Sequence, residues 1–390
     1  MRRRLVVPAV LVLLIGAAAG ALGALALQPQ VGRAGHPPPV TPAAVPEPGP
    51  RVLLVWTHAG LPAGLPAAVG HLAGVQAVTP VAGGEVDMSG STAGDGRPAD
   101  HPPPGWSIPL DTAAVDPATY PAFVPPGARE LVGSLAPGRV LLGTTSAGLR
   151  RLGTGAVLDL AGRQLNVAGV VDDVLVGAAE AVVSAEEGRA LGLRERYLLV
   201  AYTGDRAGLE ALIRGVLPAG LAVRFRGPGE TPFLREGDAV LPQALVKARF
   251  GEFAYRRGLG SDIVVDPAFE AENVVAETVP LLGRVRCHRA VLPALRGAMD
   301  ELGARGLATL VDANGFGGCY VPRTIARGES LSRHAWGVAF DLTTGKNPTG
   351  LTGVQDPRLI AVMRRWGFTS GASWLVPDPS HFEYLRPPEG

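Results

Sequence analysis

The feature that most limits how this chain can fold is an uncharged apolar run near its start, residues 5–27. The run follows three consecutive arginines and is long enough to cross a bilayer as a helix. Because a cationic segment before such a run stays in the cytoplasm, we expect everything after it to be extracytoplasmic. Residues 24–26, Ala-Leu-Ala, leave two alternatives open for residues 1–27: a cleaved signal peptide and a membrane anchor.

The rest of the composition indicates folded domains. The chain has 390 residues, of which 47% are hydrophobic and 18% charged, so it can bury apolar cores and is too long for one ordinary domain. Its 36 basic and 35 acidic side chains are mixed along the sequence. Without a block of one sign, nothing points to a nucleic-acid partner.

The apolar pattern divides the chain into regions. Residues 28–50 are rich in proline and predict an extended linker. Residues 51–226 contain two strand–helix–strand patterns around a β-rich insertion, which predicts an α+β module built from two β-α-β units. The expected elements are 51–56, 61–72 and 75–81 in the first unit, 196–200, 206–216 and 221–225 in the second, and strands 139–143, 156–160 and 164–171 in the insertion.

Residues 227–285 have mixed signals and are predicted to connect this module to a C-terminal domain, residues 286–390. An amphipathic stretch lies at 241–253, and we expect loops containing glycine and acidic residues after it. Apolar residues at helical spacing predict a helix over 291–302 that packs on the C-terminal domain.

The stretch 155–171, with its short strands and hairpin turn, is similar to the extracytoplasmic domain of MacB-like and FtsX-like transporter permeases. The similarity covers about residues 51–226. It implies a binding or positioning module outside the cytoplasm, with a membrane protein as its partner. No nucleophile paired with a base, and no metal-ligand spacing, occurs in this part of the sequence.

Two short segments of the C-terminal domain carry residues of catalytic type. In the first, His334 precedes a strand on which Asp341 projects inward, and in the second His381 lies near the start of another strand. Two imidazoles and one carboxylate leave one tetrahedral position of a Zn²⁺ ion open, which is the pattern of a catalytic zinc site. Asp378, three residues before His381, is the candidate base. Arg323 can bind a substrate carboxylate or an oxyanion, and we favour the carboxylate.

The two-part pattern Ser332-x-His334-x-x-Gly-x-Ala-x-Asp341, followed by Asp378-x-x-His381-Phe-Glu, resembles the VanY-type D-alanyl-D-alanine carboxypeptidases and their endopeptidase relatives. The resemblance implies a small α+β domain with an antiparallel sheet. It implies zinc binding by the two histidines and Asp341, a base role for Asp378, and a substrate-binding role for the matching arginine. The roles carried over are metal ligands His334, Asp341 and His381, base Asp378, substrate-binding Arg323, and Ser332 in the pocket wall.

The sequence departs from the family pattern around the second segment. Residues 367–374 replace the usual Trp-Gly-rich approach, and Ser380 stands where methionine is common. These differences concern the substrate pocket more than the metal ligands.

The chain has two cysteines, Cys287 and Cys319. In an exported protein an isolated pair indicates one disulfide, with two buried thiols as the alternative. The resemblance to the VanY-type family also agrees with a disulfide, because some relatives carry both cysteines.

The leading functional hypothesis is a zinc peptidase that removes the terminal D-alanine from peptidoglycan stem peptides outside the cytoplasm. One alternative is an endopeptidase that cuts within the stem peptide or crossbridge, because the same motifs serve both reactions. The other is a catalytically silent sensor of wall peptides.

Overall fold

The computed structural model describes residues 51–58, 60–227, 238, 240–325 and 330–388. All of them belong to one compact unit, Pro48–Gly390. The predicted membrane segment and the proline-rich linker, residues 1–50, lie outside the described residues, so those predictions are not tested. Within the described part of the chain, no helix has both the length and the apolar character needed to span a bilayer.

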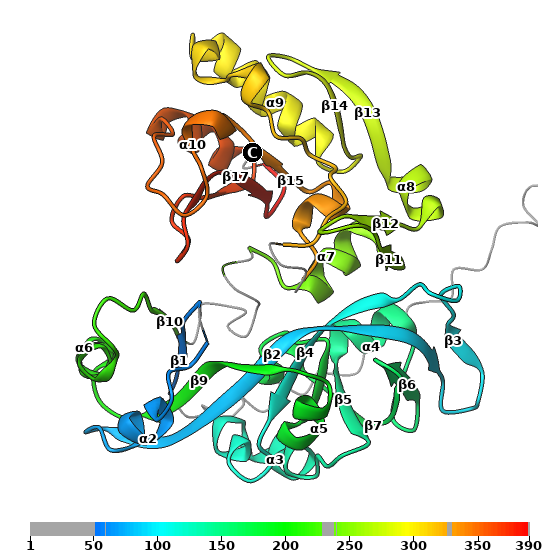
Figure 1. Cartoon of the computed structure of the whole chain (residues 1–390), viewed down its shortest axis with the longest axis vertical. Coiled ribbons are helices and arrows are strands. Elements are labelled where there is room, and N and C mark those ends of the chain that lie inside the picture. Colours follow the sequence, from blue (N-terminus) through cyan, green and yellow to red (C-terminus); the bar gives the residue numbers. More distant parts are fainter. Residues whose placement is uncertain (1–50, 59, 228–237, 239, 326–329, 389–390) are drawn as a thin grey trace, which may run out of the picture. The chain divides into compact units, whose positions relative to one another are not determined.

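The first part of the fold is a sheet with the strand order β10-β1-β9-β2, in which all neighbours are antiparallel. Alternate residues of β1 enter two cores: Leu53 and Val55 pack with side chains of α2 and α6, and Leu54 and Trp56 pack on the opposite face. Figure 1 shows α2 and α6 near β1. Because both faces are covered, this strand is an unbroken apolar run. The elements are β1 (Val52–Trp56), α2 (Leu65–Gly70), β2 (Val75–Thr92), β9 (Arg194–Tyr202), α6 (Arg206–Val216) and β10 (Arg224–Arg226).

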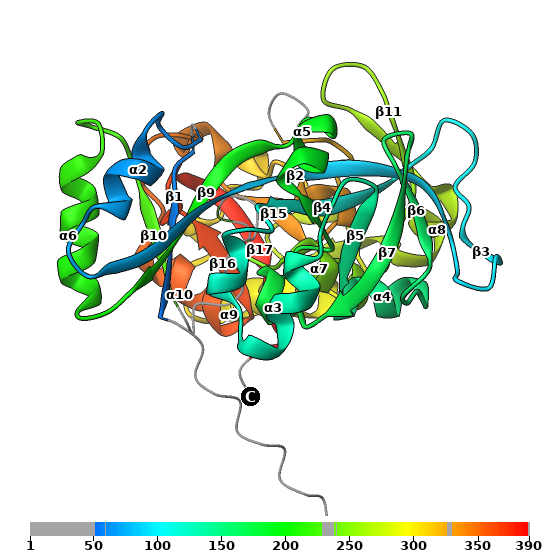
Figure 2. The same ribbon diagram turned by 90° about the horizontal axis from the view of Figure 1, so that it is seen from below.

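Strand β2 continues from this sheet into a closed barrel, as Figure 2 shows. Six strands close in the order β2-β4-β8-β5-β7-β6, and β6 pairs back with β2. The sequence predicted β5, β6 and β7 but not β4 and β8, and these two complete the barrel around buried Met88, Leu110 and Leu142. The further elements are β3 (Pro98–Asp100), β4 (Ile108–Val115), α3 (Pro126–Gly133), β5 (Arg139–Gly143), α4 (Thr144–Arg150), β6 (Val157–Leu160), β7 (Arg163–Val171), β8 (Ala181–Ser184) and α5 (Ala185–Ala190).

The region predicted to lead to Cys287 through loops is instead ordered into short elements, so that prediction is wrong. After helix α7 (Gln243–Phe250) come two antiparallel hairpins. Buried and exposed residues alternate over residues 284–287 of β14, but β13 is buried only at Val274 and Val279, and both short strands carry charged side chains, so neither shows a clear period of two in the sequence. The elements are β11 (Tyr255–Arg257), β12 (Ile263–Val265), α8 (Pro267–Asn273), β13 (Val274–Val279) and β14 (Gly283–His288).

The C-terminal part combines helices with a three-stranded antiparallel sheet, in the order β15-β17-β16. Helix α9 buries Leu295, Met299 and Leu302 in a core shared with Phe340 and Phe382 of the sheet. The fold class is therefore mixed α and β, with small antiparallel sheets. The elements are α9 (Leu292–Ala304), β15 (Ala339–Asp341), α10 (Pro357–Arg365), β16 (Phe368–Gly371) and β17 (Asp378–Tyr384).

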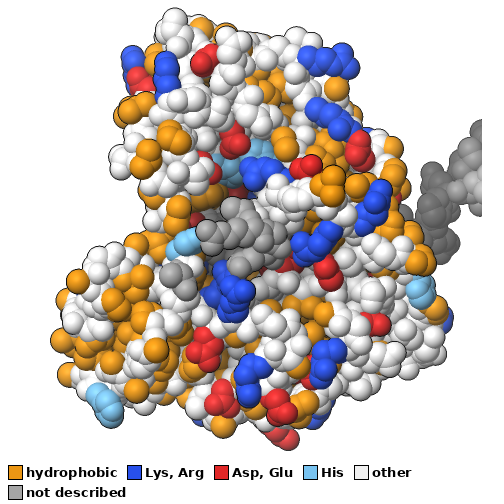
Figure 3. Space-filling view, viewed as in Figure 1, with side chains coloured by type: hydrophobic (Ala, Val, Ile, Leu, Met, Phe, Trp, Pro, Cys, Tyr) orange, Lys and Arg blue, Asp and Glu red, His pale blue; other side chains and the backbone are white. Residues whose placement is uncertain are grey.

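The surface carries charges of both signs. On the face drawn in Figure 3, Lys and Arg side chains are interspersed with Asp and Glu side chains, and apolar side chains lie between them. No large area of a single charge is visible on this face.

Candidate metal centre

The candidate centre is built on two neighbouring strands and the turn that precedes one of them. Asp341 of β15 lies directly opposite His381 of β17 in the antiparallel register. His334 enters from a short 3₁₀ turn, η6 (Arg333–Trp336), immediately before β15. Ser332 begins this turn, and its side chain accepts a hydrogen bond from the His334 amide.

Gly337 ends the turn, and the geometry requires glycine there. Its φ is +69°, a left-handed conformation that favours glycine. A Cβ at this position would lie 2.7 Å from the backbone nitrogen of His288. The glycine of the motif therefore lets the chain turn from His334 into β15.

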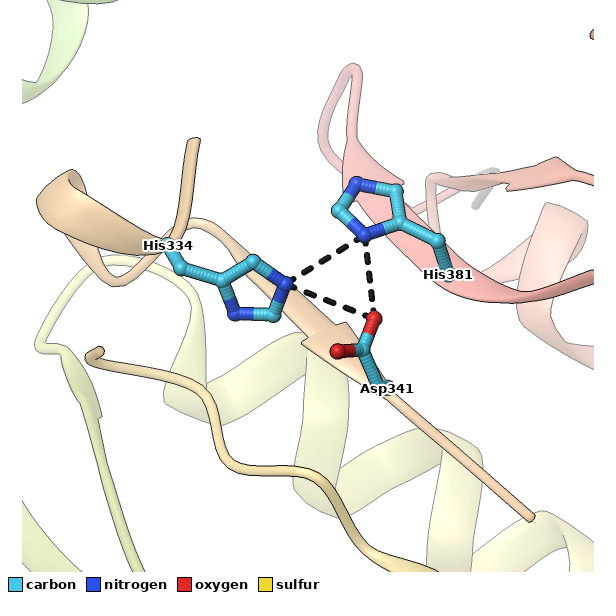
Figure 4. A group of neighbouring side chains, drawn as sticks. All are labelled: His334, Asp341 and His381. Atoms are coloured by element: carbon cyan, nitrogen blue, oxygen red, sulfur yellow. Dashed lines mark hydrogen bonds and ion pairs between the residues drawn. The ribbon is translucent and has the colours of Figure 1, made fainter. Parts of the chain in front are cut away.

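Three side-chain atoms converge on one point, as Figure 4 shows. His334 Nε2 lies 3.3 Å from His381 Nδ1 and 3.4 Å from Asp341 Oδ1. His381 Nδ1 lies 3.0 Å from the same Asp341 oxygen. In a tetrahedral site with bonds of about 2.0–2.1 Å, neighbouring ligand atoms are about 3.3 Å apart. The spacing thus fits one small divalent ion without movement of the side chains.

The remaining ring nitrogen of each histidine has its own partner. His334 Nδ1 lies 3.1 Å from the carbonyl oxygen of Cys319, so this nitrogen carries the proton and Nε2 presents a lone pair. His381 Nε2 lies 3.3 Å from Glu383 Oε1, which by the same argument leaves Nδ1 as the ligand atom. Such outer partners fix tautomer and ring orientation at metal sites. Two lone pairs and a carboxylate oxygen facing one point fit a cation between them.

The predicted disulfide is present, between Cys287 and Cys319. It joins β14 to the segment whose Cys319 carbonyl accepts from His334. Both cysteines are buried. The covalent link therefore fixes the acceptor that selects the tautomer of one predicted ligand.

The electrostatics follow from the same contacts. Burial raises the pKa of the Asp341 carboxyl, but the hydrogen bonds and charges of His334 and His381 outweigh it and hold this pKa well below its usual range. Burial lowers the pKa of His381, but Asp341 and Glu383 outweigh it and raise this pKa to about 9. Burial also opposes ionisation of Glu383, yet His381, Arg333 and the Val240 amide lower its pKa. Two carboxylates thus flank His381, which keeps its proton at neutral pH in the metal-free protein, and a cation that binds at Nδ1 would displace that proton.

The other predicted site residues lie around the cluster with less defined contacts. Asp378 begins β17, is half-buried and accepts a hydrogen bond from Ser380 at 3.1 Å. Arg323 is half-buried, and its carbonyl accepts from the Ser332 amide. Its side chain has no hydrogen bond or ion pair with any residue that the structure describes. The roles of Asp378, Arg323 and Ser332 remain predictions.

Sequence reasoning assigned no role to three buried residues, Arg333, Gln243 and Lys247. Arg333 donates to Gln243 Oε1 at 3.3 Å and to the Leu241 carbonyl at 3.0 Å. Gln243 and Lys247 lie four residues apart on the buried side of α7. Two polar residues at this spacing within an apolar helix face are a signal that could have marked them, because buried polar groups need partners.

Comparison with known proteins agrees with the sequence motif. Residues 326–384 match the model of a family described as D-alanyl-D-alanine carboxypeptidase. The carboxypeptidase match takes in all three convergent side chains and Asp378, whereas Arg323 and both cysteines precede it. The predicted resemblance of the C-terminal region is therefore confirmed. This peptidase family is metal-dependent, and the His-Asp-His cluster is of a kind that can bind a metal.

Solved structures with some likeness are extracytoplasmic parts of transporters. The periplasmic region of MacB from Actinobacillus actinomycetemcomitans is 10% identical with a TM-score of 0.32, covering 45% of this chain and 88% of that one. The extracellular domain of the ABC-type transporter YknZ from Gram-positive bacteria is 10% identical with a TM-score of 0.29, covering 41% of this chain and 88% of that one. No curated protein matches the chain.

Proposed function

We propose that this chain is a zinc-dependent D-alanyl-D-alanine carboxypeptidase that trims peptidoglycan stem peptides. The observation that carries the proposal is the convergence of His334 Nε2, His381 Nδ1 and Asp341 Oδ1, each within 3.4 Å of the other two. Three protein ligands leave one tetrahedral position for water or substrate, as in catalytic sites. The family match over residues 326–384 supports a peptidase.

Each residue of the site then has its own role in the reaction. His334, Asp341 and His381 would hold the zinc ion, which would supply a Lewis acid for the scissile carbonyl and for a water nucleophile at neutral pH. Asp378 accepts the proton of the attacking water and returns it to the departing D-alanine amine. His334 and His381 are kept in their ligand tautomers by the Cys319 carbonyl and Glu383.

Arg323 is assigned to the carboxylate at the end of the substrate. Its guanidinium has no hydrogen bond or ion pair with a described residue, and a half-buried guanidinium can bind a carboxylate through two parallel hydrogen bonds. A carboxylate at this point marks the substrate as a free C-terminus. This assignment favours the carboxypeptidase over the endopeptidase.

We propose that the reaction takes place outside the cytoplasm. The Cys287–Cys319 disulfide is typical of oxidising compartments, and the apolar run at 5–27 is typical of export. The substrate is therefore the peptide of the cell wall and not a cytoplasmic precursor. Whether residues 51–226 bind a membrane partner remains a prediction.

Release of D-alanine from a stem pentapeptide tests the base. Asp378→Asn should lower kcat at least about a hundredfold, within the usual effect of removing a general base, while zinc stays bound. Asp300→Asn is the matched control, because Asp300 is exposed on α9 and should leave kcat unchanged. Unchanged release by Asp378→Asn would refute the assignment of the base.

The same peptide with a C-terminal amide tests Arg323. We expect Arg323→Met to raise KM for the free-acid peptide strongly and to have little effect on the amide, whereas Arg364→Met, on exposed Arg364, should change neither. Cleavage inside the peptide instead of D-alanine release would favour the endopeptidase. Tight binding without any product would favour the sensor.

A further inference from the structure

The two predicted histidine ligands are supported by a short segment that precedes helix α7. The Val240 amide donates to Glu383 Oε2 at 2.9 Å, and the other oxygen of Glu383 faces His381. The Leu241 carbonyl accepts from Arg333, the residue next to His334. This support segment, residues 240–242, therefore contacts Glu383, which faces His381, and Arg333, the chain neighbour of His334.

Gln243 joins the support segment to the N-terminal module. Its Oε1 accepts from Arg333 at 3.3 Å. Its Nε2 donates to Glu180 at 3.3 Å and to the Pro109 carbonyl at 3.2 Å. The oxygen of this amide thus faces a donor and its NH₂ group faces two acceptors. These contacts fix the orientation of the amide group.

Glu180 is itself held rigidly, although it lies in the module and not in the peptidase region. It accepts from the Asp111 amide at 3.1 Å and pairs with Lys247 at 2.9 Å. Arg150 lies 3.6 Å from the same carboxylate. Glu180, Gln243 and Lys247 are all at most 1% exposed. Hydrogen bonds between buried polar groups favour one arrangement, because another arrangement would leave more of these groups unpaired than Arg150 Nε and Arg333 Nε, which have no hydrogen-bond partner among the residues that the structure describes.

A second contact reaches the same turn by another route. Glu85 of β2 accepts from the Leu331 amide at 3.2 Å, one residue before Ser332 begins the η6 turn. The module therefore contacts the backbone before His334 and, through Gln243, the side chain of Arg333.

We infer that the module of residues 51–226 helps to position the ligands of the metal centre. Gln243 is the positioning residue, because it links the module to Arg333, the residue next to His334. Gln243 does not touch substrate or metal. It fixes the arginine behind the first ligand, while the neighbouring Val240 amide fixes Glu383 behind the second. The inference rests on the proposed metal-dependent function. It gives the module, which lies outside the sequence motif of the site, a role in positioning the metal ligands.

Zinc affinity of the full chain, measured by competition with a chromophoric chelator, tests this. Gln243→Met keeps an unbranched side chain of similar size and removes all three hydrogen bonds. We expect zinc affinity to fall about tenfold, the lower end of the effect of losing outer partners at metal sites. Gln164→Met is the matched control, since Gln164 is exposed on β7, and it should bind zinc as the wild type does.

Two further readouts separate positioning from general damage. Near-ultraviolet circular dichroism of the metal-free chain should be unchanged in Gln243→Met, and kcat should fall while KM for the pentapeptide stays constant. If Gln243→Met does not fold, Arg333→Lys decides, because it keeps the charge but cannot bond Gln243 and Leu241 with one planar fork; its zinc affinity should fall likewise.

The outcomes distinguish this inference from the proposed function. A folded Gln243→Met or Arg333→Lys chain that binds zinc within twofold of the wild type would overturn the positioning role and leave the peptidase proposal standing. A wild-type chain that binds no zinc would overturn both.

Discussion

Replacing Glu383 by glutamine changes one heavy atom and should weaken metal binding at the centre. The carboxylate of Glu383 accepts from two donors, the Val240 amide at 2.9 Å and His381 Nε2 at 3.3 Å. A glutamine has a single oxygen, so it can accept from only one of them. The residue is 5% exposed, and no bulk water can replace the lost acceptor.

The magnitude follows from which donor keeps the oxygen. The Val240 amide cannot change its proton, so the glutamine oxygen should face it and turn the NH₂ group toward His381. Without an acceptor at Nε2, a neutral His381 ring keeps its one proton on Nδ1, the atom that faces Asp341 and His334. Binding a metal at Nδ1 must reverse this change of tautomer, and the loss of an outer carboxylate costs about 10–100-fold in metal affinity. Unfolding free energy should fall by about 1–3 kcal/mol if one donor stays unpaired.

Chelator competition measures the affinity, and urea unfolding of the metal-free chain measures the stability. Glu272→Gln is the control, because Glu272 is exposed on α8 and the same chemical change there should alter neither quantity. Zinc affinity of Glu383→Gln within twofold of the wild type would show that the tautomer of His381 does not depend on Glu383.

Two other predictions concern stability. Replacing both Cys287 and Cys319 by serine removes a link across 32 residues, and loop entropy predicts a loss of about 4 kcal/mol in unfolding free energy by urea titration; a loss below about 1 kcal/mol would contradict it. Burial raises the pKa of Glu252, but Lys247 and Arg150 lower it below its usual 4.5, so its stabilisation is present above that pH and is lost as pH falls through the depressed value. The difference in unfolding free energy between wild type and Glu252→Gln should therefore shrink from pH 6 to pH 3, and a constant difference would contradict the ion pairing.

The strands that could be predicted from the sequence are those with continuous apolar runs. β1 and the second half of β9, residues 197–202, are covered on both faces, so their residues are apolar or aromatic, and the amphipathic helix α6 begins and ends where the pattern predicts. β8 has only four residues and β4 includes a proline and an aspartate, so neither has a distinct period. Closure of the barrel depends on the pairing of β6 with β2, a contact between distant segments that no local pattern contains.

The candidate site divides in the same way. His334, Asp341 and His381 could be predicted because each lies in a short local motif, and the strand register brings the two motifs together. Gln243 and Glu180 could not, because their contacts to Arg333 and to each other span 90 and 63 residues. Their importance appears only when the module, helix α7 and the η6 turn are seen in contact.

Zinc reconstitution of the metal-stripped chain tests the central claim most directly. D-alanine release from a stem pentapeptide is measured before and after zinc is added in steps up to two equivalents. We expect no release from the stripped chain and full release at one equivalent of zinc per chain. Release without metal, or a chain that holds one zinc and still releases no D-alanine, would contradict it.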